Sequence, residues 1–238
     1  MENNEKDFIL QHKELYERSK LIDLTFGGPS VYFHNEAIKQ QRESKMFLSN
    51  RHIEMIYATL TAWGMHRMGE KVLVKLTNFA EFEKSILDNK TIFEELKDKS
   101  IVNCKPETYL MYLEKIKEAY KLLRVSINPN ATIVANSKAL AHILPDLVPP
   151  IDQQHTIRFF TQEKEDFYYV NKKGKLTSRK VKMPEVEKQF EEFINYCSRI
   201  KYLFDKCDSS IFTLNNIGFN TSFPKIIDNM IMTYVKSV

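Results

Sequence analysis

The chain has 238 residues, of which 43% are hydrophobic and 12% aromatic. This apolar content is enough for a folded core and excludes a disordered chain, which would be poor in aromatic residues and strongly charged. The formal net charge of +4 permits an acidic partner such as nucleic acid without requiring one.

The first residues, Met1 to Lys6, lack the basic and apolar regions of a signal peptide, and no stretch has the apolar length of a membrane span. We therefore expect a cytoplasmic protein with no membrane contact. Cys104, Cys197 and Cys207 are widely spaced, with no histidine at zinc-ligand spacing. We expect reduced thiols, no metal and no cofactor, and the oligomeric state stays open.

Hydrophobic periodicity predicts a mainly α fold, a compact multi-helix single domain over residues 1–238. Phe8, Leu15 and Ile22 recur every seven residues, which predicts one helix from residue 5 to residue 24. The glycines and proline at 27–29 end it. Ser30 is then a candidate cap for a second helix that reaches about residue 47.

Apolar residues at helical spacing from residue 53 to residue 64 predict a third helix that closes at Gly69, its candidate C-terminal cap. It carries Trp63, the only tryptophan, which is either a core residue or the wall of a pocket. His66 and Arg67 follow it and His52 precedes it. These polar residues make a pocket near Trp63 a candidate site.

Two shorter helices are predicted at 78–88 and 91–97, with Asn78 and Thr91 as candidate caps. Pro106 opens a longer helix, which ends before the break at 128–130. Pro184 opens another long helix that reaches about residue 207, and Pro224 opens the last one. No internal repeat or long linker divides the chain.

Aromatic and β-branched residues on either side of a glycine-containing turn predict a small β-hairpin insertion at 167–182. Its basic residues could contact phosphates, and the aromatic residues Phe167, Tyr168 and Tyr169 could stack on bases. Equally, the charges could keep a solvated strand edge from aggregating. The candidate nucleic-acid-binding residues are Lys172, Lys173, Lys175, Arg179, Lys180 and Lys182.

The stretch 131–160 carries the candidate chemistry. It predicts a turn, a short helix beginning near Ser137, a proline-rich connection, and a helix that begins at Asp152. His155 and Arg158 follow Asp152 by one and two turns, and we count both among the candidate pocket residues. His142, inside the apolar helix, is predicted to be a hydrogen-bonded histidine of the core or its boundary.

Two elements of this stretch, 137–139 (Ser-Lys-Ala) and 150–152 (Pro-Ile-Asp), resemble the signature region of helix-hairpin-helix DNA glycosylases. In that family a hairpin turn precedes the Lys-Ala element, and the Pro-x-Asp element opens the next helix. The resemblance implies DNA as partner, Lys138 as nucleophile and Asp152 as the carboxylate that assists base loss, since a carboxylate stabilises developing positive charge. Val134 and Asn136 replace the family's hairpin glycines, so the resemblance is to a degenerate member, catalytic or not.

Other interpretations remain open. Asp152 can be an ordinary helix cap and Lys138 an exposed helix residue. The sequence has no phosphate-binding Gly-rich loop, dinucleotide fingerprint, HExxH motif or Gly-x-Ser-x-Gly elbow. We expect a nucleic-acid-associated protein. The alternatives are a non-catalytic helical interaction protein and an enzyme that acts on a small molecule in a pocket near Trp63.

Overall fold

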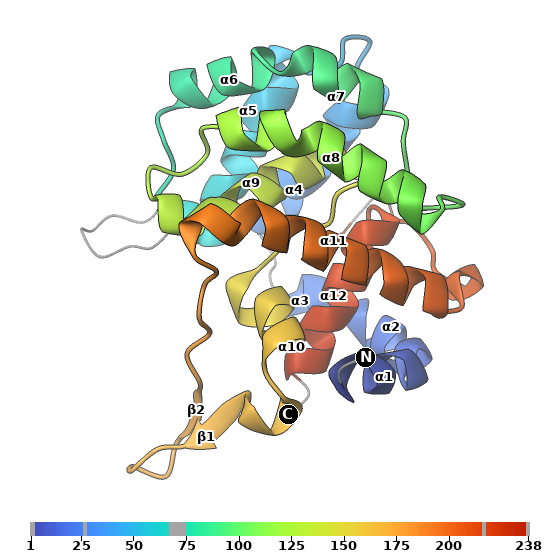
Figure 1. Ribbon diagram of the computed structural model, residues 1–238, viewed down its shortest axis with the longest axis vertical. Coiled ribbons are helices and arrows are strands. Elements are labelled where there is room, and N and C mark those ends of the chain that lie inside the picture. Colours follow the sequence, from blue (N-terminus) through green and yellow to red (C-terminus); the bar gives the residue numbers. More distant parts are fainter. Residues whose placement is uncertain (1–2, 26–27, 67–74, 216–217, 237–238) are drawn as a thin grey trace.

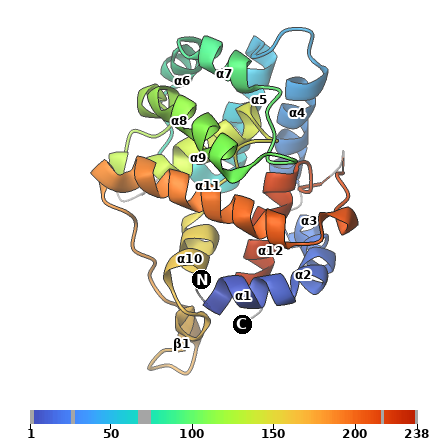
Figure 2. The same cartoon turned by 45° about the vertical axis from the view of Figure 1, so that its right-hand side comes forward.

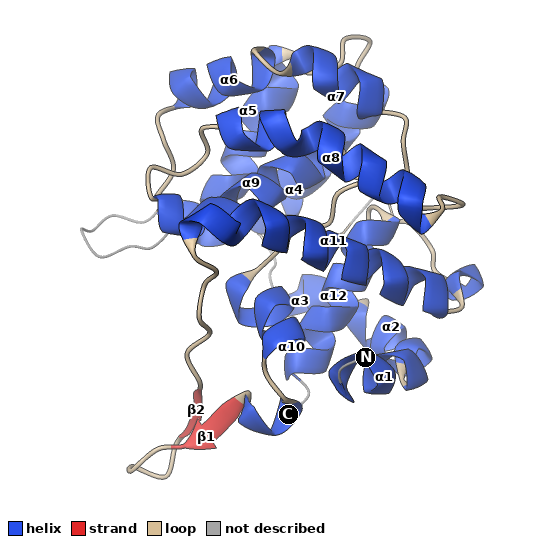
Figure 3. Cartoon of the chain, in the orientation of Figure 1, coloured by secondary structure: helices blue, strands red, loops and turns tan. Residues whose placement is uncertain are grey.

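The computed structural model describes residues 3–25, 28–66, 75–215 and 218–236. Within these ranges the chain is mainly α-helical, as predicted, with one two-stranded antiparallel hairpin (Figures 1 and 3). No described helix has the length and apolar composition needed to cross a membrane. The longer helices are α4 (Pro29–Glu43), α5 (Asn50–Leu60), α8 (Pro106–Leu122), α9 (Thr132–Ile143), α11 (Gln189–Lys206) and α12 (Phe223–Lys236).

Helix α11 crosses the middle of the molecule between two groups of helices (Figures 1 and 2). Above it lie α4, α5, α8 and α9 together with α6 (Phe79–Leu87) and α7 (Lys90–Leu96). Below it lie α12, α10 (Arg158–Thr161) and the N-terminal helices, and the hairpin extends from the bottom. The predicted hairpin is confirmed: β1 (Tyr168–Val170) pairs with β2 (Leu176–Ser178).

The N-terminal segment is three short helices, α1 (Asn3–Leu10), α2 (His12–Ser19) and α3 (Ile22–Thr25), so the prediction of one continuous helix was wrong. The backbone leaves the helical conformation at Gln11, with φ −98° and ψ 7°. Phe8, Leu15 and Ile22 are nevertheless all buried. The chain bends because the apolar stripe follows a curved core surface that a straight helix would leave.

Two predicted helix caps were wrong. Gly28 precedes α4 at φ 81°, a conformation that glycine adopts readily, and the Ser30 hydroxyl donates instead to the carbonyl of Ala62 at 3.2 Å. Asn89, not Thr91, precedes α7, and its side chain makes no capping bond. Asn78 does cap α6, because its side chain accepts from the Glu81 amide at 3.0 Å. Gly69, the other predicted cap, lies outside the described residues.

Helix α12 is deeply buried, since only Phe223, Met232 and Lys236 of its 14 residues fall outside the buried class. It packs against α2, α11 and the π-helical turn η3 (Gln153–Ile157). A helix that is buried all round is normally apolar all round. Helix α12 instead buries Lys225, Asp228 and Asn229, and the first two line the candidate site.

Candidate functional site

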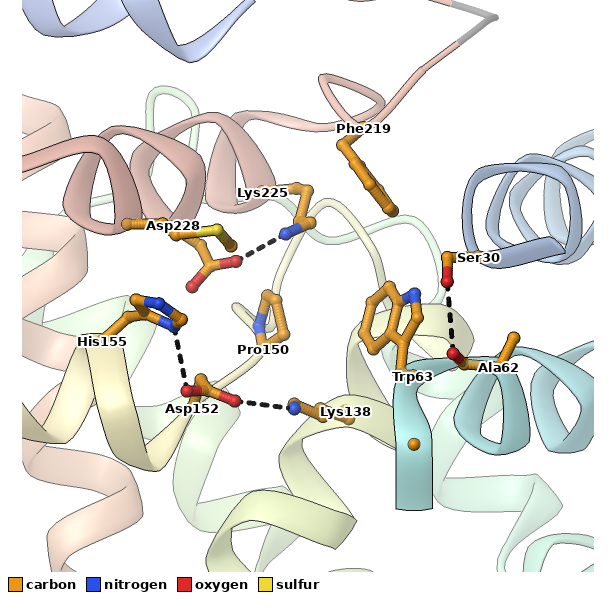
Figure 4. A pocket seen from close by; sticks show the side chains of 12 residues that line it. Ser30, Ala62, Trp63, Lys138, Pro150, Asp152, His155, Phe219, Lys225 and Asp228 are labelled. Atoms are coloured by element: carbon orange, nitrogen blue, oxygen red, sulfur yellow. Dashed lines mark hydrogen bonds and ion pairs between the residues drawn. The ribbon is translucent and has the colours of Figure 1, made fainter. Parts of the chain in front are cut away.

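A pocket of about 300 Å³ lies where the upper and lower groups of helices meet (Figure 4). We call it the Trp63 pocket. Helix α4, the π-helical turn η1 (Thr61–Met65) and α9 supply its walls from above, while η3 and α12 supply them from below. Its lining residues are Ser30, Ala62, Trp63, Gly64, Lys138, Pro150, Asp152, His155, Phe219, Lys225, Asp228 and Met232.

Trp63 forms the aromatic wall because of an irregularity at the end of α5. The helix continues as the π-helical turn η1, and Gly64 ends the regular conformation with φ 78°. Single π-turns of this kind are frequent at functional sites. The indole Nε1–H of Trp63 is buried and has no hydrogen-bond partner among the described residues. Trp63 therefore lies at the edge of the core and lines the pocket.

Lys138 and Asp152 meet at the pocket wall, with Lys138 Nζ 2.9 Å from Asp152 Oδ2. Asp152 also begins η3: its Oδ1 accepts from the Gln154 amide at 2.8 Å and from His155 Nδ1 at 3.0 Å. The expected cap is thus present, and the expected exposure of Lys138 is not, since 12% of its side chain is exposed. One carboxylate serves both the cap and the ion pair.

The charge of Asp152 follows from these contacts. Burial alone would raise the pKa of the carboxyl, but the Lys138 ammonium and the hydrogen bond from His155 lower it well below its usual value. Asp152 is therefore ionised at neutral pH. An ionised carboxylate beside an aromatic wall can stabilise positive charge or accept a proton, but it cannot act as a general acid.

A second ion pair lines the same pocket from α12. Lys225 Nζ lies 2.6 Å from Asp228 Oδ2, and 8% and 4% of the two side chains are exposed. The Lys225 and Lys138 ammonium nitrogens lie 5.6 and 5.7 Å from the centroid of the Trp63 ring. We did not identify Lys225 or Asp228 from the sequence. The available signal was two charges three residues apart in a helix that is mainly apolar.

Two buried histidines support Trp63 from the side of the core. The His34 ring stacks on it at 5.7 Å and the His142 ring lies 5.1 Å from it. His142 Nδ1 lies 2.7 Å from the Lys138 carbonyl, which can only accept, so Nδ1 carries the proton. Burial lowers the pKa of His142 to about 4 and that of His34 well below its usual value, so both rings are neutral at pH 7.

The proton on His142 Nδ1 determines the direction of the next two hydrogen bonds in this series. The unprotonated His142 Nε2 accepts from His34 Nδ1 at 2.9 Å, and His34 Nε2 then accepts from the Thr221 hydroxyl at 2.9 Å. These hydrogen bonds join α4, α9 and the segment before α12, so they hold three walls of the pocket together. His142 is the buried, hydrogen-bonded histidine that the sequence predicts, whereas His34 was missed.

The other predicted pocket residues lie elsewhere. His66 is exposed and pairs through its backbone with Lys75, and Arg67 lies outside the described residues. His52 is fully buried behind α9, where its Nε2 lies 3.1 Å from the His142 carbonyl. Of the predicted pocket residues that the structure describes, only Trp63 and His155 line the pocket, because helix spacing does not determine which face of each helix meets another element.

Arg158, also predicted to line the pocket, is 1% exposed and points to the hairpin. Its guanidinium donates to the carbonyls of Phe167 and Arg179 and to the Ser178 hydroxyl. Gln153 adds a bond to the Val181 carbonyl at 2.9 Å. The segment that begins at Asp152 thus anchors the hairpin.

The six basic residues predicted to bind nucleic acid are all exposed on or beside the hairpin, and none of them lines the pocket. Arg179 pairs with Asp166 at 3.4 Å and lies over the Tyr169 ring. The hairpin turn, which carries Lys172, Lys173 and Lys175, extends away from the body of the protein (Figure 1). No contact of these lysines indicates a partner or argues against one.

Helix α9 begins at Thr132, so the turn predicted before Ser137 is helical. Val134 and Asn136 are buried inside it, and the Asn136 amide donates to the Tyr120 carbonyl at 2.8 Å. Apolar contacts on nearly every side of this segment favour helix over a turn. The amides near residue 134 are therefore used within the helix.

Among the described residues, no group of three or more His, Cys, Asp or Glu side chains is placed to hold a metal ion. Comparisons with protein family models, with curated proteins and with solved structures find no match to this chain. The geometry of the Trp63 pocket is therefore the basis on which function is argued.

Proposed function

We propose that the protein is nucleic-acid-associated and glycosylase-like, and that the Trp63 pocket takes one unstacked nucleoside of the nucleic acid. The observation that carries the proposal is the Lys138–Asp152 ion pair in the wall of a pocket with an aromatic side. These are the two residues that the helix-hairpin-helix resemblance selects, and they are 14 positions apart in the chain. Their closeness in space is what a shared reaction requires.

The chemistry uses the two groups in different roles. Asp152, ionised, stabilises the positive charge that develops on the sugar as the base departs with the electron pair of the glycosidic bond. The departing base takes up a proton from solvent. Lys138, once it has lost its proton, forms a bond from Nζ to the sugar carbon, and Asp152 is a proton acceptor within reach. Trp63 offers a surface on which a base can stack.

The hairpin gives the proposal a second support. Arg158 and Gln153 attach the hairpin to the segment that begins at Asp152. The exposed lysines at its turn are therefore connected to the segment that begins at Asp152, which supplies the reacting carboxylate. Phosphate contacts at these lysines would position a nucleic-acid strand relative to the pocket.

Binding is tested first, with labelled single- and double-stranded DNA across a salt series. We expect binding that weakens with salt, and at least about tenfold weaker binding when Lys172, Lys173 and Lys175 are all changed to Glu, because phosphate contacts carry much of the affinity. The control changes Lys6, Lys13 and Lys121, also exposed, to Glu and so alters the net charge equally. Equal loss in both variants would show that only net charge matters.

Base release is tested on duplexes that carry a mismatched or damaged base. Asp152→Asn should abolish release, and Lys138→Gln should abolish trapping of the protein on DNA by borohydride, with folding checked by circular dichroism. Salt-sensitive binding without base release would reduce the function to association. Unchanged activity in both variants would exclude the Lys138–Asp152 pair as the reaction site.

A second candidate is an enzyme that acts on a small molecule in the same pocket. The observation in its favour is that the pocket is bounded by side chains of the helical body and by none of the hairpin lysines. This candidate predicts that DNA does not bind at low salt, whereas small aromatic compounds quench the fluorescence of Trp63.

A further inference from the structure

The Lys225–Asp228 pair on α12 has contacts that leave part of its hydrogen-bonding capacity unused. Lys225 donates to Asp228 Oδ2 at 2.6 Å and to Asn229 Oδ1 at 2.7 Å, which occupies two of the three ammonium protons. Asn229 is itself oriented, because its Nδ2 donates to Asn220 at 2.7 Å. The third side of the Lys225 ammonium faces the aromatic rings at the pocket, Trp63 at 5.6 Å and Phe219 at 5.3 Å.

Stability gives no reason for burying this pair. Taking two charges out of water costs several kcal/mol per ion before any attraction is gained, and well-packed apolar residues are commonly as stabilising. Yet only 8% of the Lys225 side chain and 4% of the Asp228 side chain are exposed, in a helix with 11 of its 14 residues buried. Charges that are kept in such a place, and that line a pocket, favour a role in recognising a ligand.

Asp228 has capacity left as an acceptor. Its Oδ2 binds Lys225, while its Oδ1 receives, from the part of the chain that the structure describes, only a long bond from the Thr156 hydroxyl at 3.4 Å. The pair therefore presents a donor beside an acceptor. Across the pocket, Lys138 donates to Asp152 at 2.9 Å, its one hydrogen-bond acceptor among the described residues, and so retains two N–H groups. In Figure 4 both ammonium groups and both carboxylates surround the same space beside Trp63.

These groups specify the edge of a ligand. Each of the two ammonium groups requires an acceptor, and the Asp228 carboxylate beside Lys225 requires a donor. Both ammonium nitrogens lie within 5.7 Å of one ring centroid, so they are at most about 11 Å apart, a distance that a single substituted ring with a hydrogen bond at each end can span. The two lysines and two aspartates balance in charge, which favours a neutral ligand.

We propose that the Trp63 pocket selects a neutral planar ring with an N–H between two carbonyl oxygens, as in the bases uracil and thymine. The carbonyls face Lys138 and Lys225, the ring N–H faces Asp228, and the ring stacks on Trp63. A ring with an amino group in place of a carbonyl, as in cytosine or adenine, turns a donor towards an ammonium and leaves buried groups unpaired. This inference rests on the proposed function for the pocket and adds the class of base.

The test measures binding of uridine, thymidine, cytidine and adenosine to the full chain, by quenching of the single tryptophan and by calorimetry. We expect uridine and thymidine to bind at least about tenfold more tightly than cytidine and adenosine, since sites built for polar groups reject analogues that mispair. Equal affinity for all four nucleosides would overturn the proposal, and so would failure of uridine and thymidine to bind at millimolar concentration.

Lys225→Met should remove this preference while the protein stays folded. The control is Lys201→Met on α11, because Lys201 is equally buried and pairs with Asp205 but does not line the pocket. If Lys225→Met leaves Asp228 unpaired and fails to fold, the double change Lys225→Met and Asp228→Leu removes both charges and tests the same contacts. A folded variant that keeps the uridine preference would overturn the assignment of Lys225.

The two proposals fail in different ways. Preference for uridine without DNA binding or base release would contradict the glycosylase-like function but support the proposed ligand class. Base release from DNA with no preference between uridine and cytidine would support the glycosylase-like function but contradict the proposed ligand class.

Discussion

At the scale of single residues, the buried histidines show how burial determines charge. His52 and His142 are 0% and 1% exposed, and burial lowers the pKa of each to about 4. Each keeps one N–H bound to a carbonyl, which a neutral ring can satisfy. Both rings are therefore neutral in the folded protein and become charged, at moderately acid pH, only when it unfolds.

This difference predicts a pH dependence of stability. Since the unfolded histidines bind protons from about pH 6.5 downwards and the folded ones only near pH 4, the free energy of unfolding should fall as pH falls through that interval, by up to about 3 kcal/mol for each histidine. Urea unfolding at pH 7, 6 and 5 measures it above the range in which the lowered carboxyl pKa values matter.

His52→Gln is the control for this prediction. The glutamine amide can still donate to the His142 carbonyl but takes up no proton, so the variant should lose less stability between pH 7 and pH 5 than the wild type. The same loss in both proteins would contradict the assignment of a lowered pKa to His52.

At the scale of elements, a candidate cap residue is predicted correctly from the sequence where its side chain can reach the first backbone amides of its own helix. Asn78 has extended ψ of 156° and caps α6, whereas Asn89 before α7 has ψ of 10° and cannot direct its side chain to the helix amides. The same limit explains the broken N-terminal segment. Its heptad spacing identifies the buried face correctly, but the bend at Gln11 comes from the surface on which that face packs.

The two candidate caps allow a direct comparison. Asn78→Ala should lower the free energy of unfolding by about 1 kcal/mol, because the Glu81 amide loses its acceptor. Thr91→Ala removes an exposed side chain that caps nothing and should change stability by less than about 0.5 kcal/mol. Denaturant unfolding measures both. Equal losses would mean that Thr91 does cap α7 in solution.

At the scale of the whole molecule, the two ends of the chain close on each other (Figures 1 and 2). Phe8 contacts the Phe159 and Tyr234 rings, at 5.6 and 6.5 Å between centroids, and the Tyr234 hydroxyl donates to Asp7 at 2.9 Å. The N-terminal helices thereby secure α12, which carries Lys225 and Asp228. Asp7 and Tyr234 are more than 200 residues apart, so the sequence does not show that the position of α12 depends on the N-terminal helices.

We expect the chain to unfold as a single domain. Phe8→Ala should cost about 3–5 kcal/mol, as the loss of a fully buried aromatic side chain does, and should lower the stability seen by Trp63 fluorescence and by far-ultraviolet circular dichroism alike. Leu10→Ala in the same helix removes a residue that is 83% exposed and should change little. Separate transitions for the two probes would contradict a single domain.

The sequence determined the helical class and the hairpin, because these depend on periodicity and turn chemistry. It named Lys138 and Asp152 as candidates, and the tertiary structure brought them into contact. Only the tertiary structure decided which polar residues share the pocket. It brought Lys225 and Asp228 into the pocket, placed His34 behind Trp63 and turned Arg158 towards the hairpin. The physical reason is that side-chain burial and ion pairing depend on which helix faces pack together. These faces belong to segments far apart in the sequence, and residue spacing within each segment does not predict which of them make contact.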